Sequence, residues 1–150
     1  MDEFDVANEY LDAGDGDRAM PIFRKLADQG RVAAMSSIGH TYLHGVGGVP
    51  QDYDQAFEWF TRAADNGCPQ AMYHLGLCNA KGYGTPVDPA LALQWYEKSA
   101  ARGDEDAMYE VGVCHECGSG TVADKEAARG WYRKAADRGQ EEAAERLKTL

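Results

Sequence analysis

The sequence predicts an all-α fold: an α/α solenoid (superhelix) of about four antiparallel helix–turn–helix repeats, followed by a C-terminal capping helix. Three tryptophans recur at intervals of 36 residues, each followed by another aromatic residue: Trp59, Trp95 and Trp131. A glycine upstream of each tryptophan recurs at intervals of 37 and 36 residues: Gly39, Gly76 and Gly112. Self-similarity at such a period is typical of repeat proteins, in which stacked helical hairpins bury a shared core.

Two helices are predicted in each repeat, and the middle copy illustrates both. Its first helix begins near Ala71, carries small or apolar residues at helical spacing, and ends before Gly82. Its second helix begins after Asp88, a residue suited to cap a helix that starts with Pro89, and it ends at Gly103. Equivalent residues stand in the copies before and after it, so we expect all three hairpins to be built in the same way.

The repeats are predicted to form a single domain of residues 1–150. Three clear copies are predicted: 31–67, 68–103 and 104–139. A degenerate copy at 2–30 has Ile22 in the tryptophan position, as expected for a terminal repeat that faces water on one side. Residues 140–150 are predicted to form a polar-faced capping helix. The first linker, 47–52, is one residue longer than its counterparts, which explains the interval of 37.

The composition indicates a globular, acidic protein. Hydrophobic residues make up 44% of the chain, charged residues 27%, and the net charge is −10. Nucleic acids and anionic membranes require a basic surface, so neither is expected as a partner. The acidic segment 1–5 does not resemble a signal peptide, and the longest uncharged segment, 32–51, holds too many glycines and polar residues to span a membrane. A cytoplasmic location is therefore predicted.

Histidines and cysteines form two patterns that could bind zinc. His40 and His44 share one helical face, and Cys114 with Cys117 resembles half of a zinc site. Each pattern lacks the remaining ligands, and the two are separated by two repeats, on the order of 20 Å, whereas zinc bonds are about 2.0–2.3 Å long. We therefore predict no metal site and no cofactor. Helix spacing also keeps Cys78 and Cys114 beyond disulfide reach, so no disulfide is predicted.

No arrangement of catalytic residues is evident in the sequence. The glycine-rich segment 45–49 lacks the lysine and the preceding strand of a phosphate-binding loop. Acidic residues are spread over predicted caps and outer helix faces, and no pair is singled out as acid and base. The chain is therefore predicted not to be an enzyme.

The recurring residues resemble the Sel-one-like repeat, a relative of the tetratricopeptide repeat. In the middle copy, the residues that carry the resemblance are Ala71-Met72-Tyr73-x-Leu75-Gly76, Gly82-x-Gly84, Asp88, Ala92 and Trp95-Tyr96-x-Lys98-x-Ala100-x-x-Gly103. The resemblance covers almost the whole chain. It implies a right-handed superhelix of helix pairs, a role as adaptor or scaffold in protein complexes, and no catalytic residues. Cysteine-rich secreted members join the two helices of a repeat by a disulfide, whereas no copy here has a matching cysteine pair.

Helical periodicity predicts which residues face a partner, because the first helices of such hairpins line the concave side of the stack. The predicted groove residues are His40, His44, Tyr73, Leu77, Lys81, Tyr109, Val113 and Glu116. Tyr73 and Tyr109 are the expected aromatic anchors for a peptide or protein segment. The alternative is that both tyrosines are structural and pack between repeats.

A protein-binding scaffold is the favoured function, with a protein or peptide partner and no small-molecule cofactor. One alternative is a hydrolase of cell-wall-type amides, an activity linked to some cysteine-rich relatives, although no nucleophile and base are paired in this sequence. Another is a metal-linked dimer through Cys114 and Cys117 or through the pair of His40 and His44. Stoichiometric zinc in the purified protein would support that alternative.

Overall fold

A computed structural model describes all residues from Met1 to Leu150. It consists of nine α-helices and one short 3₁₀ helix. The elements are α1 (Glu3–Asp12), α2 (Gly16–Asp28), α3 (Val32–His44), η1 (Val46–Gly48), α4 (Tyr53–Asp65), α5 (Pro69–Lys81), α6 (Pro89–Ala101), α7 (Glu105–Cys117), α8 (Lys125–Asp137) and α9 (Glu141–Thr149). The predicted all-α class is confirmed, and no helix combines the length and apolar character needed to cross a lipid bilayer.

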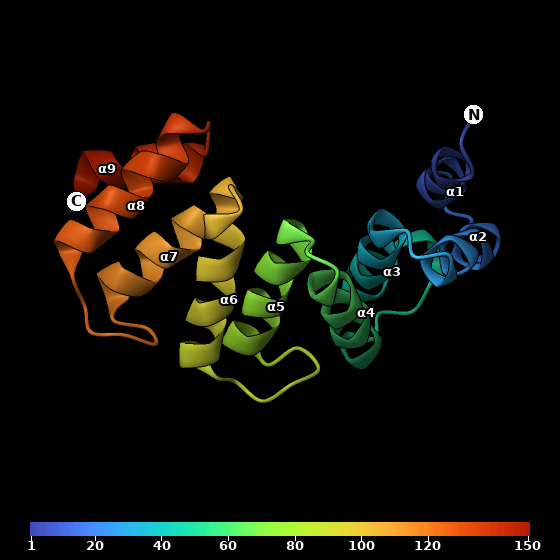
Figure 1. Cartoon of the computed structure of the whole chain (residues 1–150), viewed down its shortest axis with the longest axis horizontal. Coiled ribbons are helices and arrows are strands. Elements are labelled where there is room, and N and C mark those ends of the chain that lie inside the picture. The colour runs from blue at the N-terminus through green and yellow to red at the C-terminus, as the bar shows by residue number, and fades with distance from the viewer. The chain divides into compact units, whose positions relative to one another are not determined.

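The chain forms two compact units, which are described separately. Unit 1 comprises residues 1–71 and 83–85, and unit 2 comprises residues 72–82 and 86–150. In unit 1, α1 packs against α2 and α3 against α4, and in unit 2 α7 packs against α8 (Figure 1). These pairs are the predicted helical hairpins, and the degenerate N-terminal copy is one of them. The grouping of all residues into a single domain stays a prediction.

An aspartate begins the second helix of each clear repeat, as predicted. Each of these side chains accepts a hydrogen bond of 3.1 Å from the backbone N–H three residues later: Asp52, Asp88 and Asp124. The backbone N–H of the same aspartates donates to a carbonyl near the end of the first helix, at Tyr42, Asn79 and His115 respectively. The side chain thus caps one helix while the backbone closes the linker onto the other.

Linker glycines allow one hairpin to lie against the next. Gly120, in the linker between α7 and α8, has a φ of 73°, a conformation that favours glycine. A Cβ at this position would collide with the carbonyl of Pro89, the first residue of α6. The linker of one repeat therefore rests on the start of the second helix of the preceding repeat, within unit 2.

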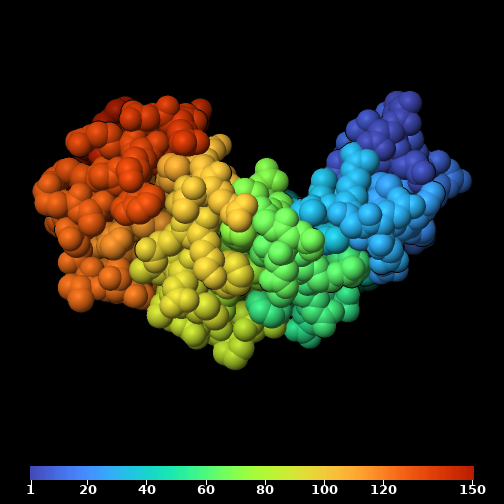
Figure 2. Space-filling view, in the orientation of Figure 1, coloured from blue at the N-terminus to red at the C-terminus, as the bar shows by residue number.

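The core of unit 2 joins residues from four helices. Its buried members include Leu93 and Tyr96 on α6, Val111 on α7 and Tyr132 on α8, and Ala143 of α9 joins them. In the space-filling view, the yellow-to-red part of the chain, which contains α6 to α9, has a continuous surface (Figure 2). Because α9 contributes a buried residue and packs against α8, it covers the C-terminal end of the repeats, as predicted for a capping helix.

Candidate functional site

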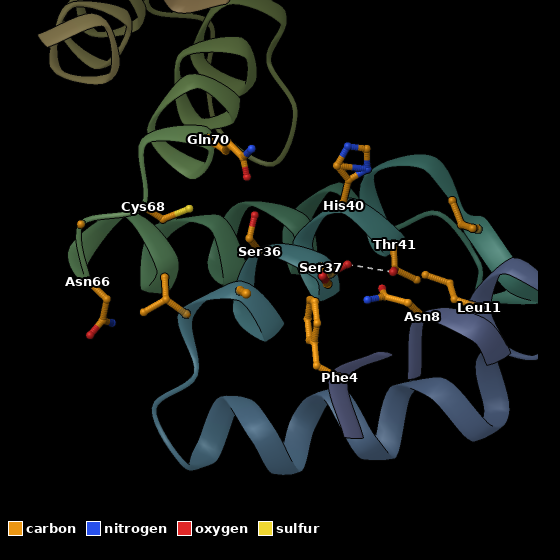
Figure 3. Close-up of a pocket in the computed structure, with 14 residues that line it drawn as sticks. Phe4, Asn8, Leu11, Ser36, Ser37, His40, Thr41, Asn66, Cys68 and Gln70 are labelled. Carbon is orange, nitrogen blue, oxygen red and sulfur yellow. Dashed lines mark hydrogen bonds between the residues drawn. The ribbon is translucent and has the colours of Figure 1, made fainter. Parts of the chain in front are cut away.

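Unit 1 contains a groove of about 780 Å³ between α1, α3 and the turn that leads into α5. Its walls are formed by Phe4, Asn8, Leu11, Val32, Ala33, Ser36, Ser37, His40, Thr41, Val46, Asn66, Gly67, Cys68 and Gln70. Figure 3 shows α1 and α3 contributing most of these side chains, which come from the first helices of two hairpins. This surface, which we call the α1–α3 groove, lies on the face that the periodicity predicts for partner binding.

Some polar side chains of the α1–α3 groove already form hydrogen bonds within the chain, and others do not. The Thr41 hydroxyl donates to the Ser37 carbonyl at 2.8 Å, the dashed line in Figure 3. The Asn66 side-chain amide donates to the Arg62 carbonyl at 2.8 Å. The Asn8 amide and the Ser36 hydroxyl, in contrast, form no hydrogen bond within the chain. The groove therefore offers hydrogen-bonding groups that a bound segment could use.

Phe4 is held firmly at one wall of the groove. Its ring packs edge-on against Phe23 with centroids 5.7 Å apart, and the Arg31 guanidinium lies 4.7 Å from its centroid. Arg31 also forms a salt bridge of 2.6 Å with Asp2, and this hydrogen-bonded pair lowers the pKa of the Asp2 carboxyl. An apolar side chain fixed in this way can contact a partner with little loss of side-chain entropy.

The two histidines predicted for the groove lie together on α3. The imidazole rings of His40 and His44 have centroids 4.6 Å apart and a tilt of 44°. Both residues are exposed, and His40 lines the groove whereas His44 lies one turn further along the helix. No cluster of three or more His, Cys, Asp or Glu side chains is placed to hold a metal ion.

In unit 2, both predicted anchor tyrosines are only partly exposed. The ring of Tyr73 on α5 packs against Tyr96 with centroids 5.9 Å apart, and that of Tyr109 on α7 packs against Tyr132 at 5.6 Å. Burial raises the pKa of the Tyr73 hydroxyl to about 12, and nearby carboxylates, led by Glu110, add to the effect. Each ring therefore supports the core with one side and is open to solvent with the other.

The remaining predicted residues of unit 2 have different environments. Val113 on α7 packs on the core of unit 2 and is partly exposed, and Leu77 on α5 is partly exposed as well. Lys81 is exposed at the end of α5 and lowers the pKa of the Glu110 carboxyl, opposing the effect of burial. These three side chains are available at the surface of the first helices, as the periodicity predicts.

Glu116 forms contacts with two other helices that the repeat pattern does not predict. Its carboxylate accepts a hydrogen bond of 2.7 Å from the Tyr132 hydroxyl and forms an ion pair with the Arg146 guanidinium. The hydrogen bond from Tyr132 and the ion pair lower the pKa of Glu116, although burial opposes them. The contact ties α7 to α8 and α9. Glu116, which is predicted as a charged residue of the groove, is therefore already paired within the chain.

Four carboxylates that act on an anchor tyrosine were not predicted from the sequence. The charges of Glu110, Asp106, Asp104 and Glu142 all raise the pKa of the Tyr73 hydroxyl, and Asp104 among them already caps α7. Asp106 and Glu110 lie three residues before and one residue after Tyr109 on α7. Their spacing could have indicated a shared helical surface, whereas Glu142 on α9 lies outside the repeat pattern.

The four cysteines form no disulfide. Cys78 and Cys114 are buried, and burial raises the pKa of each thiol to about 11. Cys68 lines the α1–α3 groove and Cys117 is exposed.

Capped hairpins with recurring linkers define the chain as an α/α helical-repeat protein. The Sel1 repeat matches it in three consecutive segments: 32–68, 69–104 and 105–140. Because these segments cover most of the sequence, the chain belongs to the Sel1 repeat family. Residues 1–31 lie outside the matched segments and include the α1–α2 hairpin. Sel1-repeat proteins typically act in protein–protein interactions, and the family is generally non-enzymatic.

Two solved structures show the same fold over nearly the whole chain. One is c5321, described as a protective antigen present in uropathogenic Escherichia coli strains, with 34% identity and a TM-score of 0.91 over 97% of this chain and 32% of that protein. The other is a Sel1 repeat protein from Oxalobacter formigenes, with 29% identity and a TM-score of 0.88 over 97% of this chain and 59% of that one. The chain thus corresponds to part of each.

One relative of the chain is named as a component of a ubiquitin ligase. The ERAD-associated E3 ubiquitin-protein ligase component HRD3A of Arabidopsis thaliana is 37% identical over 71 residues, which are 47% of this chain and 10% of the relative. The chain therefore spans about a tenth of the length of that relative.

Proposed function

We propose that this chain is a non-catalytic interaction module that binds a segment of a protein partner on the first helices of its hairpins. The observation that carries the proposal is the α1–α3 groove, where an unpaired amide and an unpaired hydroxyl, Asn8 and Ser36, lie beside the fixed ring of Phe4. A peptide backbone offers the donors and acceptors that such groups require.

The lining of the groove agrees with a peptide of low charge. Its residues include no Asp, Glu, Lys or Arg, although the chain as a whole has a net charge of −10. Apolar side chains such as Leu11 and Val32 alternate with hydroxyl and amide groups along the walls. Pockets of about 300–1,000 Å³ with apolar walls and a few placed polar groups are typical ligand sites. The groove has the size and chemistry for a few residues of an extended segment.

The first helices of unit 2 extend this proposal to a second surface. Tyr73, Leu77, Lys81, Tyr109 and Val113 occupy the same helical face as the groove residues of α3, and all are at least partly exposed. Tyrosines contribute much contact area for little entropy cost, which is why they recur at interfaces. Family members typically act in protein–protein interactions, and the Arabidopsis relative is named as a component of an E3 ubiquitin-protein ligase.

A site-specific photocrosslinker tests the binding face. We would introduce benzoylphenylalanine at position 40, on the groove, and in a second variant at position 58, an exposed position on the second helix α4. In native lysate, we expect the probe at His40 to yield a discrete crosslinked protein, identified by mass spectrometry, and the probe at Glu58 to yield none. Equal crosslinking of the same protein from both positions would contradict the proposed face.

A groove-filling variant supplies the matched control. Ser36→Tyr places a large ring in the groove, and the chain itself carries tyrosine at the equivalent positions, Tyr73 and Tyr109. A protein that carries both Ser36→Tyr and the probe at position 40 is therefore expected to fold. It is expected to lose most of the crosslinking to the partner. Retention of the full crosslink yield by a folded Ser36→Tyr protein would show that the partner does not enter the groove.

A further inference from the structure

The first helices of the two units differ in charge at equivalent positions. Where α3 has Ala33 and Ser37 in the wall of the neutral groove, α7 has Asp106 and Glu110. Ser36, which lies between those α3 residues, is replaced by Tyr109 on α7. The same helical face is thus polar and uncharged in unit 1, and aromatic and acidic in unit 2.

The carboxylates on this face of unit 2 lack internal cations. Neither Glu110 nor Glu142 takes part in a salt bridge or a hydrogen bond within the chain, and Asp106 accepts only a long hydrogen bond of 3.4 Å from Gln140. Burial raises the pKa of the Glu110 carboxyl, and the charges of Glu142 and Asp106 raise it further. Bringing a cation to this face would therefore relieve a repulsion that the folded chain does not neutralise by itself.

The exposed sides of the tyrosine rings add a second element of recognition. Elsewhere the chain places a cation over each repeat tryptophan: Arg62 over Trp59, Lys98 over Trp95 and Lys134 over Trp131, at 4.2–4.5 Å from the ring centroid. No arginine or lysine of the chain is placed in this way over Tyr73 or Tyr109, although the His74 ring packs edge-on against Tyr73 with centroids 5.2 Å apart. An aromatic ring beside carboxylates favours a guanidinium or an ammonium group over a neutral side chain.

Lys81 and Arg146 act on this face through space, and neither forms a salt bridge with its carboxylates. The charge of Lys81 on α5 opposes the rise in the pKa of Glu110 through space and does not reverse it. Arg146 on α9 acts on Tyr109 through space and is itself bound to Glu116. The negative charges of Asp106, Glu110 and Glu142 therefore dominate this part of the surface.

We propose that unit 2 binds an arginine- or lysine-bearing segment of a protein partner on its acidic–aromatic face, formed by Tyr73, Asp106, Tyr109, Glu110 and Glu142. The cationic side chain lies against the tyrosine rings, and the carboxylates surround its charge. This inference rests on the proposed role in protein binding and specifies the chemistry of the partner. It concerns unit 2 alone and is independent of what occupies the α1–α3 groove.

The test uses a short acetylated peptide in which two arginines flank a tryptophan, titrated into the isotopically labelled full chain and followed by amide NMR shifts. We expect the largest shifts on α5 and α7 around Tyr73 and Tyr109. The same peptide with citrulline in place of arginine keeps the shape and loses the charge. It is expected to bind about tenfold more weakly, and the arginine peptide is expected to weaken as salt is raised.

A double variant identifies the carboxylates responsible. Asp106→Ala with Glu110→Ser copies the residues that α3 carries at the equivalent positions, so the fold is expected to persist, and affinity for the arginine peptide is expected to fall about tenfold. Glu97→Gln with Asp137→Asn removes the same charge from the second helices α6 and α8 and is expected to leave affinity unchanged.

Three results would overturn the inference: equal binding of the citrulline peptide, an equal loss in the control double variant, or shifts confined to other helices. If the peptide shifts only the α1–α3 groove, the inference about unit 2 fails and the proposed function stands. If the crosslinking at position 40 fails while the arginine peptide binds unit 2 as described, the assignment of the groove fails instead.

Discussion

Tyr132 takes the space that a side chain at Gly112 would need. The ring is fully buried, and a Cβ added to Gly112 would lie 2.7 Å from its Cδ1 and Cε1 atoms. The same relationship recurs in the other clear repeats, between Gly39 and Phe60 and between Gly76 and Tyr96. In each clear repeat, a glycine of the first helix therefore lets an aromatic ring of the second helix approach the backbone.

Substitution of this glycine is expected to weaken the hairpin. Gly112→Ala gains helix propensity of up to about 1 kcal/mol but forces the buried ring aside, and overpacking of this kind costs about 1–3 kcal/mol. We expect a net loss of about 1–2 kcal/mol in the free energy of unfolding, measured by urea denaturation monitored by circular dichroism.

Gly130 provides the matched control for that experiment. It lies within α8, on the other helix of the same hairpin, and a Cβ there would meet no atom within 4 Å. Gly130→Ala is therefore expected to stabilise the protein by about 0.5–1 kcal/mol. If both substitutions changed stability in the same direction, the ring packing at Gly112 would not be the reason for its glycine.

The structural roles of residues that recur in the clear copies could be predicted from the sequence, because each residue acts within its own hairpin. The spacing of Gly76 and Gly112 predicts the repeat, and Asp88 beside Pro89 predicts a helix start; in the structure, the glycines lie against an aromatic ring and Asp88 caps the helix. Local chemistry sets these features: a cap needs a side-chain acceptor, and a close approach needs a missing Cβ.

Contacts outside the repeat could not be predicted in the same way. The pairing of Glu116 with Arg146 joins α7 to α9, and no period relates these two helices. Glu110 was not predicted either: its spacing from Tyr109 could have indicated its helical face, but not its burial or the effect of the Glu142 charge on it. Both results depend on how helices pack, which a single sequence does not specify at the level of side chains.

The pair of Glu116 and Arg146 is expected to make stability depend on pH. The folded pKa of Glu116 is lowered, so its contribution is present above the unfolded pKa of about 4.3 and is lost as the pH falls through the folded pKa. Glu116→Gln is therefore expected to lose about 1 kcal/mol at pH 7 and little at pH 3, measured by chemical denaturation at both pH values.

Glu145→Gln is the control for the loss of a charge near α9. Glu145 pairs with Lys148 at 3.0 Å, but both side chains are largely exposed. Removal of the Glu145 charge is therefore expected to change the free energy of unfolding little at either pH. If Glu116→Gln lost as much stability at pH 3 as at pH 7, the cause would be altered packing and not a lost ion pair.

Glu110 is expected to show the opposite pH dependence. Burial and neighbouring carboxylates raise its folded pKa, so the carboxyl contributes most to stability below its unfolded pKa, and that contribution is lost as the pH rises through the folded pKa. Glu110→Gln is therefore expected to raise Tm by about 2 °C at pH 7 and to have no such effect at pH 3. Glu97→Gln, at an exposed position on α6, should leave Tm unchanged.

A lower Tm for Glu110→Gln at pH 7 would mean that the carboxylate has an internal partner in solution. That result would also weaken the inference that the face awaits a cation, since a neutralised Glu110 gains nothing from an arginine.

The two tyrosines allow structural and binding roles to be separated. Tyr73 and Tyr109 each pack one side against a buried ring, so Tyr73→Ser with Tyr109→Ser is expected to lose about 1–3 kcal/mol of stability per site while the helical spectrum remains, because Ser36 already serves at the equivalent position. Tyr73→Phe with Tyr109→Phe keeps the rings and is expected to retain stability.

Binding is then measured on both double variants with the arginine peptide, under conditions in which each is fully folded. Because the proposed contact uses the faces of the rings and not their hydroxyls, the phenylalanine variant is expected to bind within about twofold of the natural sequence, and the serine variant about tenfold more weakly. Natural affinity in the folded serine variant would assign both tyrosines to packing alone, and the carboxylates of α7 and α9 would then have to account for any recognition of the cation by themselves.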